Sequence, residues 1–139
     1  LYHNPTCATS RNTSALIRNS RIDPTSIRYL DNPPSKAQVV KLIAAMNFLV
    51  HELLLRKSTP YDDVNLDKAS LSDDELIDAM LQHPILINRP IVVTEWGTKL
   101  CRPSETVLDI LPLPQLAAFN KEGELNYERQ FSKRFELSA

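Results

Sequence analysis

The chain has 139 residues, a formal net charge of −1 at pH 7 and 42% hydrophobic residues. This is the length of one ordinary domain with a sizeable core, and the balanced charge gives no reason to expect binding to nucleic acid or to a membrane surface. No apolar run approaches the roughly 20 residues that span a bilayer, and the first residues lack the pattern of a signal peptide. Two cysteines far apart in the sequence are not a disulfide framework, so we expect a reducing, cytoplasmic environment.

The first part of the chain predicts a strand followed by a helix. The chain opens at Leu1 and Tyr2 without a methionine, as though a strand had been cut into, and we expect a few residues to precede it. The strand ends near Tyr2, and Thr9 or Ser10 can cap a helix that runs to about Ser20.

The middle of the chain predicts a short strand and then a helical block. Residues 27–30 form the strand, and residues 35–38 have the pattern of a capping box that opens a helix ending near Met46. A second apolar helical piece covers residues 49–55, and residues 72–75 are another capping box. The apolar faces of the two capped helices are predicted to comprise Val39, Val40, Leu42, Ile43 and Met46, then Leu76, Ile77, Met80 and Leu81.

The last third of the chain returns to strands. The β-branched residues 91–94 predict one strand, Trp96-Gly97 can form a tight turn, and residues 99–101 would return antiparallel. A final helix is predicted over residues 103–111.

The order of elements, β-α-β-α-(α-α)-β-β-α, is the layout of a thioredoxin fold, in the α/β (α+β) class, with a mixed four-stranded sheet and an inserted helical block. We expect a single domain over residues 1–139. Its charged C-terminal tail, about residues 112–139, carries Tyr127, Phe131 and Phe135 at every fourth position. That stripe predicts a helix packing onto the domain rather than a site for a partner.

Cys7 directly precedes the first predicted helix. The unpaired N–H groups and the dipole of a helix N-terminus favour an anion, which here is a thiolate or an oxyanion substrate beside it. A cysteine with a lowered pKa is a nucleophile at neutral pH. The alternative interpretation is a small buried apolar residue, the commonest fate of a single cysteine.

Pro90 directly precedes the strand predicted at residues 91–94. In a thioredoxin fold, the proline at this place is expected to be cis and to face the active cysteine, which would hold Arg89 beside Cys7. Outside that fold, the alternative is an ordinary solvent-facing arginine on a loop.

Four segments carry a resemblance to a known family. They are Tyr2-His3-Asn4-Pro5-x-Cys7-x-Thr9-Ser10-Arg11-Asn12-Thr13, Glu75-Leu76-Ile77-Asp78, the run of residues 80–94, and Leu100-Cys101-Arg102-Pro103-Ser104-Glu105. Through them the chain resembles the thioredoxin-fold, glutathione- and glutaredoxin-coupled arsenate reductases, from Tyr2 to about Glu122. The cysteine element alone is moderately specific, and its combination with residues 89–92 and 101–104 is strong.

The resemblance implies that Cys7 attacks arsenate and forms a thiol–arsenate adduct. Reduction of As(V) to As(III) takes two electrons, so a second sulfur must attack. Ser10 occupies the position of the resolving thiol in a Cys-x-x-Cys protein, and Cys101 is expected to pack inward from a strand. The implied reductant is therefore external: glutathione is a co-substrate that forms a mixed disulfide with Cys7, and glutaredoxin clears it. We expect no tightly bound cofactor and, because the histidines and cysteines lack metal-ligand spacing, no metal.

The family's oxyanion clamp of three arginines corresponds to Arg89, Arg102 and a third position. The arginine fork makes paired, charge-assisted hydrogen bonds to tetrahedral oxyanions. The family pattern resembles Leu-Leu-Arg followed six residues on by tyrosine, whereas Arg56 lies five residues before Tyr61 and an ungapped alignment puts Leu55 in its place. Either the helix shifts register and Arg56 serves, which we favour, or this arm of the clamp is weakened.

His3 and Ser10 are the remaining candidates for a role at the site. The resemblance implies that His3 influences the thiolate by charge or by a hydrogen bond, whereas a lone histidine at a strand end can equally be structural. Ser10 can hydrogen-bond the sulfur or cap the helix.

Two other functions stay open. A related thiol-dependent oxidoreductase with another substrate would share the cysteine but not the full clamp, and arsenate turnover with glutathione and glutaredoxin distinguishes it. A non-enzymatic regulator that binds RNA polymerase, found in the wider family, generally carries a Cys-x-x-Cys switch, which Ser10 argues against. A low-molecular-weight phosphatase loop is disfavoured because Cys7 and Arg11 have only three residues between them instead of five.

Overall fold

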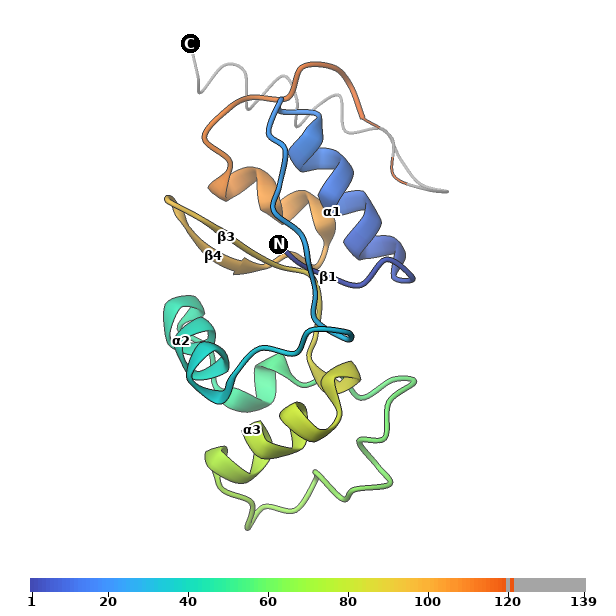
Figure 1. The fold of residues 1–139 in the computed structure, drawn as a ribbon, viewed down its shortest axis with the longest axis vertical. Helices are drawn as coiled ribbons and strands as arrows, with labels where there is room; N and C mark the ends of the chain where they lie inside the picture. The colour runs from blue at the N-terminus through green and yellow to red at the C-terminus, as the bar shows by residue number, and fades with distance from the viewer. Residues whose placement is uncertain (120, 122–139) are drawn as a thin grey trace. The chain divides into compact units, whose positions relative to one another are not determined.

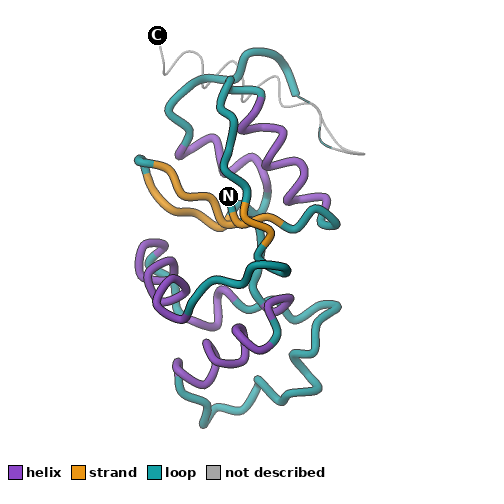
Figure 2. The backbone as a smooth tube through the Cα atoms, viewed as in Figure 1, coloured by secondary structure: helices purple, strands orange, loops and turns teal. Residues whose placement is uncertain are grey.

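A computed structural model of the chain describes residues 1–119 and residue 121. The described residues form two compact units: residues 1–27 together with those from 89 onward, and residues 28–88. Figure 2 colours the helices, strands and loops of both units. The aromatic stripe predicted at Tyr127, Phe131 and Phe135 lies outside the described residues.

The first unit is built on a sheet with strand order β2-β1-β3-β4. Its strands are β1 (Tyr2–His3), β2 (Ile27–Arg28), β3 (Ile91–Thr94) and β4 (Gly97–Leu100). β1 pairs antiparallel with β3, and β3 pairs antiparallel with β4 in a hairpin. The predicted four-stranded sheet is confirmed, although the strand expected at residues 27–30 is shorter and Cys101 follows β4 instead of lying in it.

The helices α1 (Ala8–Arg18) and η3 (Ser104–Ile110) pack together on one face of this sheet (Figure 1). The predicted cap at Thr9 or Ser10 is wrong, since α1 begins one residue after Cys7, which is itself the N-cap and uses no side-chain hydrogen bond. The backbone of Cys7 is extended, with φ −95° and ψ 122°, and its carbonyl accepts the first helical hydrogen bond from the N–H of Arg11 at 3.0 Å. The last predicted helix is present, but as a 3-10 helix.

The core of the first unit is apolar and lies where α1, η3 and the sheet meet. Removal of these side chains from water is the main term that favours this packing. The buried set comprises Leu1, Leu16, Ile17, Val92, Cys101, Val107, Leu108, Ile110 and Leu111, with Ile22 and Phe119 packed against it.

The second unit is helical, and its two main helices begin as their sequences predict. It contains α2 (Lys36–Met46), η1 (Val50–Leu53), α3 (Asp73–Gln82) and η2 (Pro84–Leu86). The Ser35 hydroxyl accepts from the N–H of Gln38 and the Ser72 hydroxyl from that of Glu75, both at 3.2 Å, and each capping box is reciprocal. Because a capping box satisfies helix N–H groups within four residues, it can be predicted locally.

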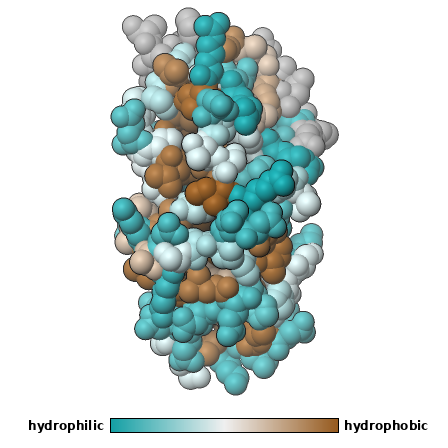
Figure 3. All heavy atoms as spheres, viewed as in Figure 1, coloured by the Kyte–Doolittle hydropathy of each residue, from teal (hydrophilic) through white to brown (hydrophobic). Residues whose placement is uncertain are grey.

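Two predictions for the second unit are wrong. Val40 is 47% exposed instead of lying on the buried face of α2. The helix expected over residues 49–55 is only the short η1, because the following residues pair with an extended segment: Leu54 bridges Ile87, and the N–H of Leu55 donates to the Leu86 carbonyl at 2.7 Å. Figure 3 shows small apolar areas scattered among polar ones on the face in view.

Candidate active site

The loop between β1 and α1 is organised by the buried side chain of Asn4. Its Oδ1 accepts from the backbone N–H of Thr6 at 3.1 Å and from the Thr6 hydroxyl at 2.8 Å, while its carbonyl accepts from the N–H of Cys7 at 3.0 Å. Such a turn directs the chain into the helix at Cys7. Sequence reasoning missed this residue, although an asparagine followed by Pro5 is a recognisable turn signal.

Cys7 is half-buried at the N-terminus of α1, and its surroundings stabilise the thiolate. Burial alone would raise its pKa, but the backbone N–H of Ser10 and the guanidinium groups of Arg89 and Arg102 donate toward the sulfur. The charge of Arg89 adds to this effect, and the pKa of Cys7 is lowered overall. The sulfur is therefore ionised at lower pH than an ordinary thiol and is correspondingly more available as a nucleophile.

Arg89 precedes β3 and Arg102 follows β4, and the guanidinium groups of both reach Cys7. Arg102 Nη1 lies 3.7 Å from Cys7 Sγ and donates to the Arg89 carbonyl at 3.0 Å. The Arg89–Pro90 peptide bond is cis, as the fold predicts, and the Arg102–Pro103 bond is also cis, which the sequence analysis did not anticipate. The first unit thus brings together two of the three predicted clamp arginines at the thiol.

His3 and Ser10 form a hydrogen-bonded pair next to the cysteine. Nδ1 of His3 lies 3.2 Å from Ser10 Oγ, which also accepts from the backbone N–H of Asn4 at 3.1 Å. Ser10 is fully buried, and its hydroxyl joins the end of β1 to the first turn of α1. Its backbone N–H, not this hydroxyl, contributes to the stabilisation of the Cys7 thiolate.

Arg56 lies in the second unit, in the loop after η1. Its guanidinium makes ion pairs with Asp62 at 2.6 Å and Asp67 at 2.9 Å, and it lies over the ring of Tyr61, 5.0 Å from the centroid. This arginine is exposed, so each of these surface pairs is weak on its own.

Cys101 has the opposite surroundings to Cys7. Its side chain is fully buried in the core of the first unit, and burial raises its pKa to about 12. The thiol lies 3.6 Å from the carbonyl of Lys99. A neutral, inaccessible thiol is a poor nucleophile, so this geometry disfavours Cys101 as a resolving cysteine.

No helix in the described part of the chain is both long enough and apolar enough to cross a membrane. Within residues 1–119 and 121, histidine, cysteine and acidic side chains do not gather in threes that could hold a metal ion. What the site offers instead is a thiolate beside two guanidinium groups and a helix N-terminus, an arrangement suited to an anionic electrophile.

The fold and the site define a thioredoxin-like protein of the thiol-dependent oxidoreductase class. A model of the ArsC family matches residues 2–110, so the chain belongs to the ArsC family. It is 61% identical over 122 residues to an arsenate reductase from Acidiphilium multivorum, covering 88% of this chain and 86% of that protein. It is 55% identical to an arsenate reductase from Yersinia enterocolitica, covering 96% and 95% of the two chains. The solved structure of an arsenate reductase from Vibrio cholerae superposes with a TM-score of 0.76 at 42% identity and covers 79% of this chain and 94% of that one. These matches confirm the family and the thioredoxin-like fold that the sequence predicted.

Proposed function

We propose that this protein reduces arsenate to arsenite with Cys7 as the nucleophile. The observation that carries the proposal is the placement of Arg102 Nη1 at 3.7 Å from Cys7 Sγ, with the pKa of that thiol lowered. The arsenate reductases to which the chain is 55% and 61% identical support the same substrate.

In the first step, the Cys7 thiolate attacks arsenic and displaces one oxygen as water, forming a sulfur–arsenic bond at As(V). The sulfur of glutathione then supplies the second thiol. Cys7 and glutathione end as a mixed disulfide, having together lost two electrons, and arsenite leaves as As(III). In sum, arsenate and two thiols give arsenite, one disulfide and one water. Glutaredoxin restores Cys7 by thiol–disulfide exchange.

The arginines bind the oxyanion and stabilise charge that grows on its oxygens. Arg89 and Arg102 already contact the reacting sulfur or its neighbours, and Arg56 is the proposed third member of the clamp. His3 acts through Ser10, which fixes the first turn of α1 and hence the backbone N–H that faces the sulfur. Since glutathione and glutaredoxin are the proposed electron donors, the cytoplasm is the proposed location.

Alkylation of Cys7 as a function of pH, with and without arsenate, tests the proposal. In a Cys101→Ser background, we expect the midpoint of alkylation below that of free cysteine and a slower reaction when arsenate is present. Arg89→Ala and Arg102→Ala should each move the midpoint up by about 1 pH unit and lower kcat/KM for arsenate roughly 10- to 100-fold. A midpoint equal to that of free cysteine, or no protection by arsenate, would contradict the assignment.

A further inference from the structure

The segment after η3 forms what we call the C-terminal strap, residues 112–119 and Lys121, which the site described above does not use. Its anchor is Gln115, which is buried although it is a polar residue. Gln115 Nε2 donates to the Leu16 carbonyl at 2.8 Å and to Ser20 Oγ at 2.7 Å, and its Oε1 accepts from Asn19 Nδ2 at 2.6 Å. The strap is thereby fixed to the C-terminal end of α1.

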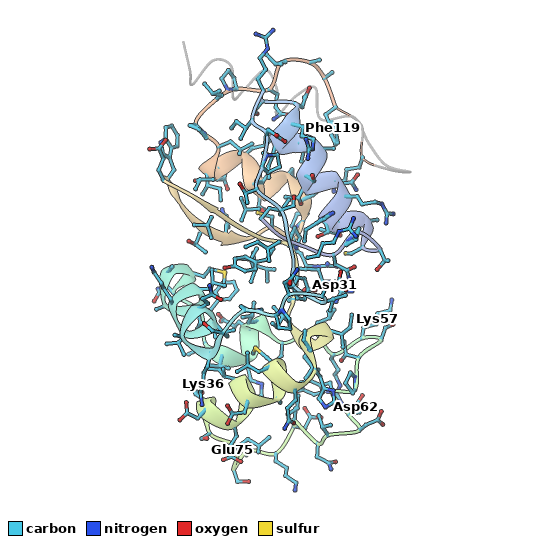
Figure 4. The ribbon with its side chains drawn as sticks, viewed as in Figure 1. Asp31, Lys36, Lys57, Asp62, Glu75 and Phe119 are labelled. Carbon is cyan, nitrogen blue, oxygen red and sulfur yellow. The ribbon has the colours of Figure 1, made fainter. Side chains whose placement is uncertain are left out.

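Further contacts continue along the strap. The backbone N–H of Leu116 donates to the Asn19 carbonyl, and Asn19 Nδ2 donates to the Ala117 carbonyl, both at 2.8 Å. Phe119, labelled in Figure 4, packs against the core of the first unit. The strap is therefore bonded to the unit before it reaches Lys121.

Lys121 ends this segment in a shielded ion pair with η3. Its Nζ lies 2.9 Å from Glu105 Oε2, and the two side chains are only 12% and 20% exposed. By contrast, the Arg18–Asp23 pair on the surface of the same unit has side chains that are 57% and 88% exposed. Because the Lys121–Glu105 pair is largely removed from water, it is screened less than the surface pair, and it ties the end of the strap to η3.

Glu105 lies three residues after Arg102, in the first turn of η3, and this turn is closed by two hydrogen bonds of its own. The N–H of Thr106 donates to the Pro103 carbonyl at 3.1 Å, and the Thr106 hydroxyl donates to the same carbonyl at 2.8 Å. The first turn of η3 is thus bonded to Pro103, the residue that directly follows Arg102, whose guanidinium reaches both the Arg89 carbonyl and Cys7 Sγ.

We propose that Lys121 is a positioning residue, and that its ion pair with Glu105 fixes the first turn of η3 and thereby holds Arg102 against Cys7. Lys121 thus contributes to the geometry of the active site without contacting the substrate. Only the expected effect of Lys121 on arsenate turnover rests on the proposed function. The position of Arg102 beside the sulfur can be measured without arsenate.

The test measures the pH midpoint of Cys7 alkylation in a Cys101→Ser background. Lys121→Met, which keeps most of the side-chain length and removes the charge, should raise the midpoint by about half a pH unit. It should also raise KM for arsenate roughly 3- to 10-fold with a smaller change in kcat. Lys121→Arg should restore both values, and Lys99→Met, which breaks the more exposed pair with Asp109, should leave both unchanged.

A double-mutant cycle separates positioning from general destabilisation. In an Arg102→Ala background, Lys121→Met should cause no further shift of the alkylation midpoint, because the group through which it acts is gone. The Glu105→Gln/Lys121→Met double variant removes both charges of the ion pair and gives the same test if the single variant folds poorly. The proposal would be overturned by an unchanged midpoint in both Lys121→Met and Glu105→Gln/Lys121→Met with Arg102 present, or by an equal shift with and without Arg102. Failure of arsenate turnover in the unmodified protein would instead count against the proposed function.

Discussion

The two cysteines of this chain carry the same functional group in opposite surroundings. Cys7 is half-buried at a helix N-terminus, with Arg102 Nη1 at 3.7 Å, and its pKa is lowered. Cys101 is fully enclosed among apolar side chains, and its pKa is raised to about 12. Both thiols are partly or wholly removed from water, which by itself disfavours the charged form in each case.

The difference arises from which groups replace the lost water. Around Cys7 they are a backbone N–H and two guanidinium groups, all of which donate to a thiolate. Around Cys101 they are mainly the apolar side chains of the core and the carbonyl of Lys99, which can only accept, and the side-chain hydrogen bond from Thr106 does not offset the burial. Burial opposes ionisation of both sulfurs, and only at Cys7 do the donors, chiefly the backbone N–H of Ser10 and the two arginines, overcome it.

The largest expected effect comes from removing the sulfur of Cys7, and removal of the sulfur of Cys101 is its control. Cys7→Ser should abolish arsenate reduction, because a hydroxyl without a dedicated base is a far poorer nucleophile than a thiolate. Cys101→Ser should leave turnover largely intact, since the external-reductant scheme has no step at that residue. Steady-state turnover with glutathione and glutaredoxin measures both, and an inactive but folded Cys101→Ser enzyme would show that the second sulfur is internal.

Protein stability should respond to pH with opposite sign at the two thiols. Cys101 stays neutral in the fold while the unfolded thiol ionises near pH 9, so its contribution to stability is lost as pH rises from 9 toward 12. The difference in unfolding free energy between the parent and Cys101→Ala should therefore shrink by roughly 1.4 kcal/mol per pH unit above 9. Denaturant unfolding of both proteins from pH 8 to 10.5 measures this change.

Cys7 is the matched control for that experiment. Because its folded pKa is lowered, its thiolate stabilises the fold above the unfolded pKa, and this contribution is lost as pH falls through the folded pKa. The difference between the parent and Cys7→Ala should thus grow with pH up to about 9 and then stay constant. The same sign at both cysteines would show that their surroundings do not shift the two pKa values in opposite directions.

Local sequence signals account for the parts of the fold that were predicted well. The capping boxes at Ser35 and Ser72 are complete within four residues, so they needed no knowledge of the rest of the chain. The early end of η1 and the C-terminal strap were not predicted, because both depend on distant partners. The carbonyl of Leu86 pairs with Leu55, and Gln115 bonds to α1 across 99 residues of sequence.

The candidate site divides in the same way, into residues that could be predicted from the sequence and residues that could not. Cys7, Arg89 and Arg102 could be placed together because a fold-level resemblance supplied the long-range pairing that spacing alone does not give. The lysine proposed to position Arg102 had no such signal, since a tail rich in charged residues gives no indication of which charge is shielded.

The smallest expected effect concerns the third arginine, Arg56. If Arg56 completes the cationic surroundings of the sulfur in the substrate complex, Arg56→Ala should raise KM for arsenate about 3- to 10-fold and change kcat little. Arg56→Lys keeps the charge but not the fork, and should recover only part of the loss.

The ion pairs of Arg56 require a control in this experiment. Asp62 and Asp67 lose their partner when Arg56 is removed, so a change in KM could arise from two freed carboxylates. Asp62→Asn and Asp67→Asn in the Arg56→Ala background remove those charges, and a KM that stays high assigns the effect to the missing guanidinium. Lys57→Ala tests the neighbouring exposed cation. A rise in KM in Lys57→Ala, with none in Arg56→Ala, would show that Lys57 and not Arg56 fills the third position of the clamp. In that case the cations that distinguish Cys7 from Cys101 are Arg89 and Arg102, without a contribution from Arg56.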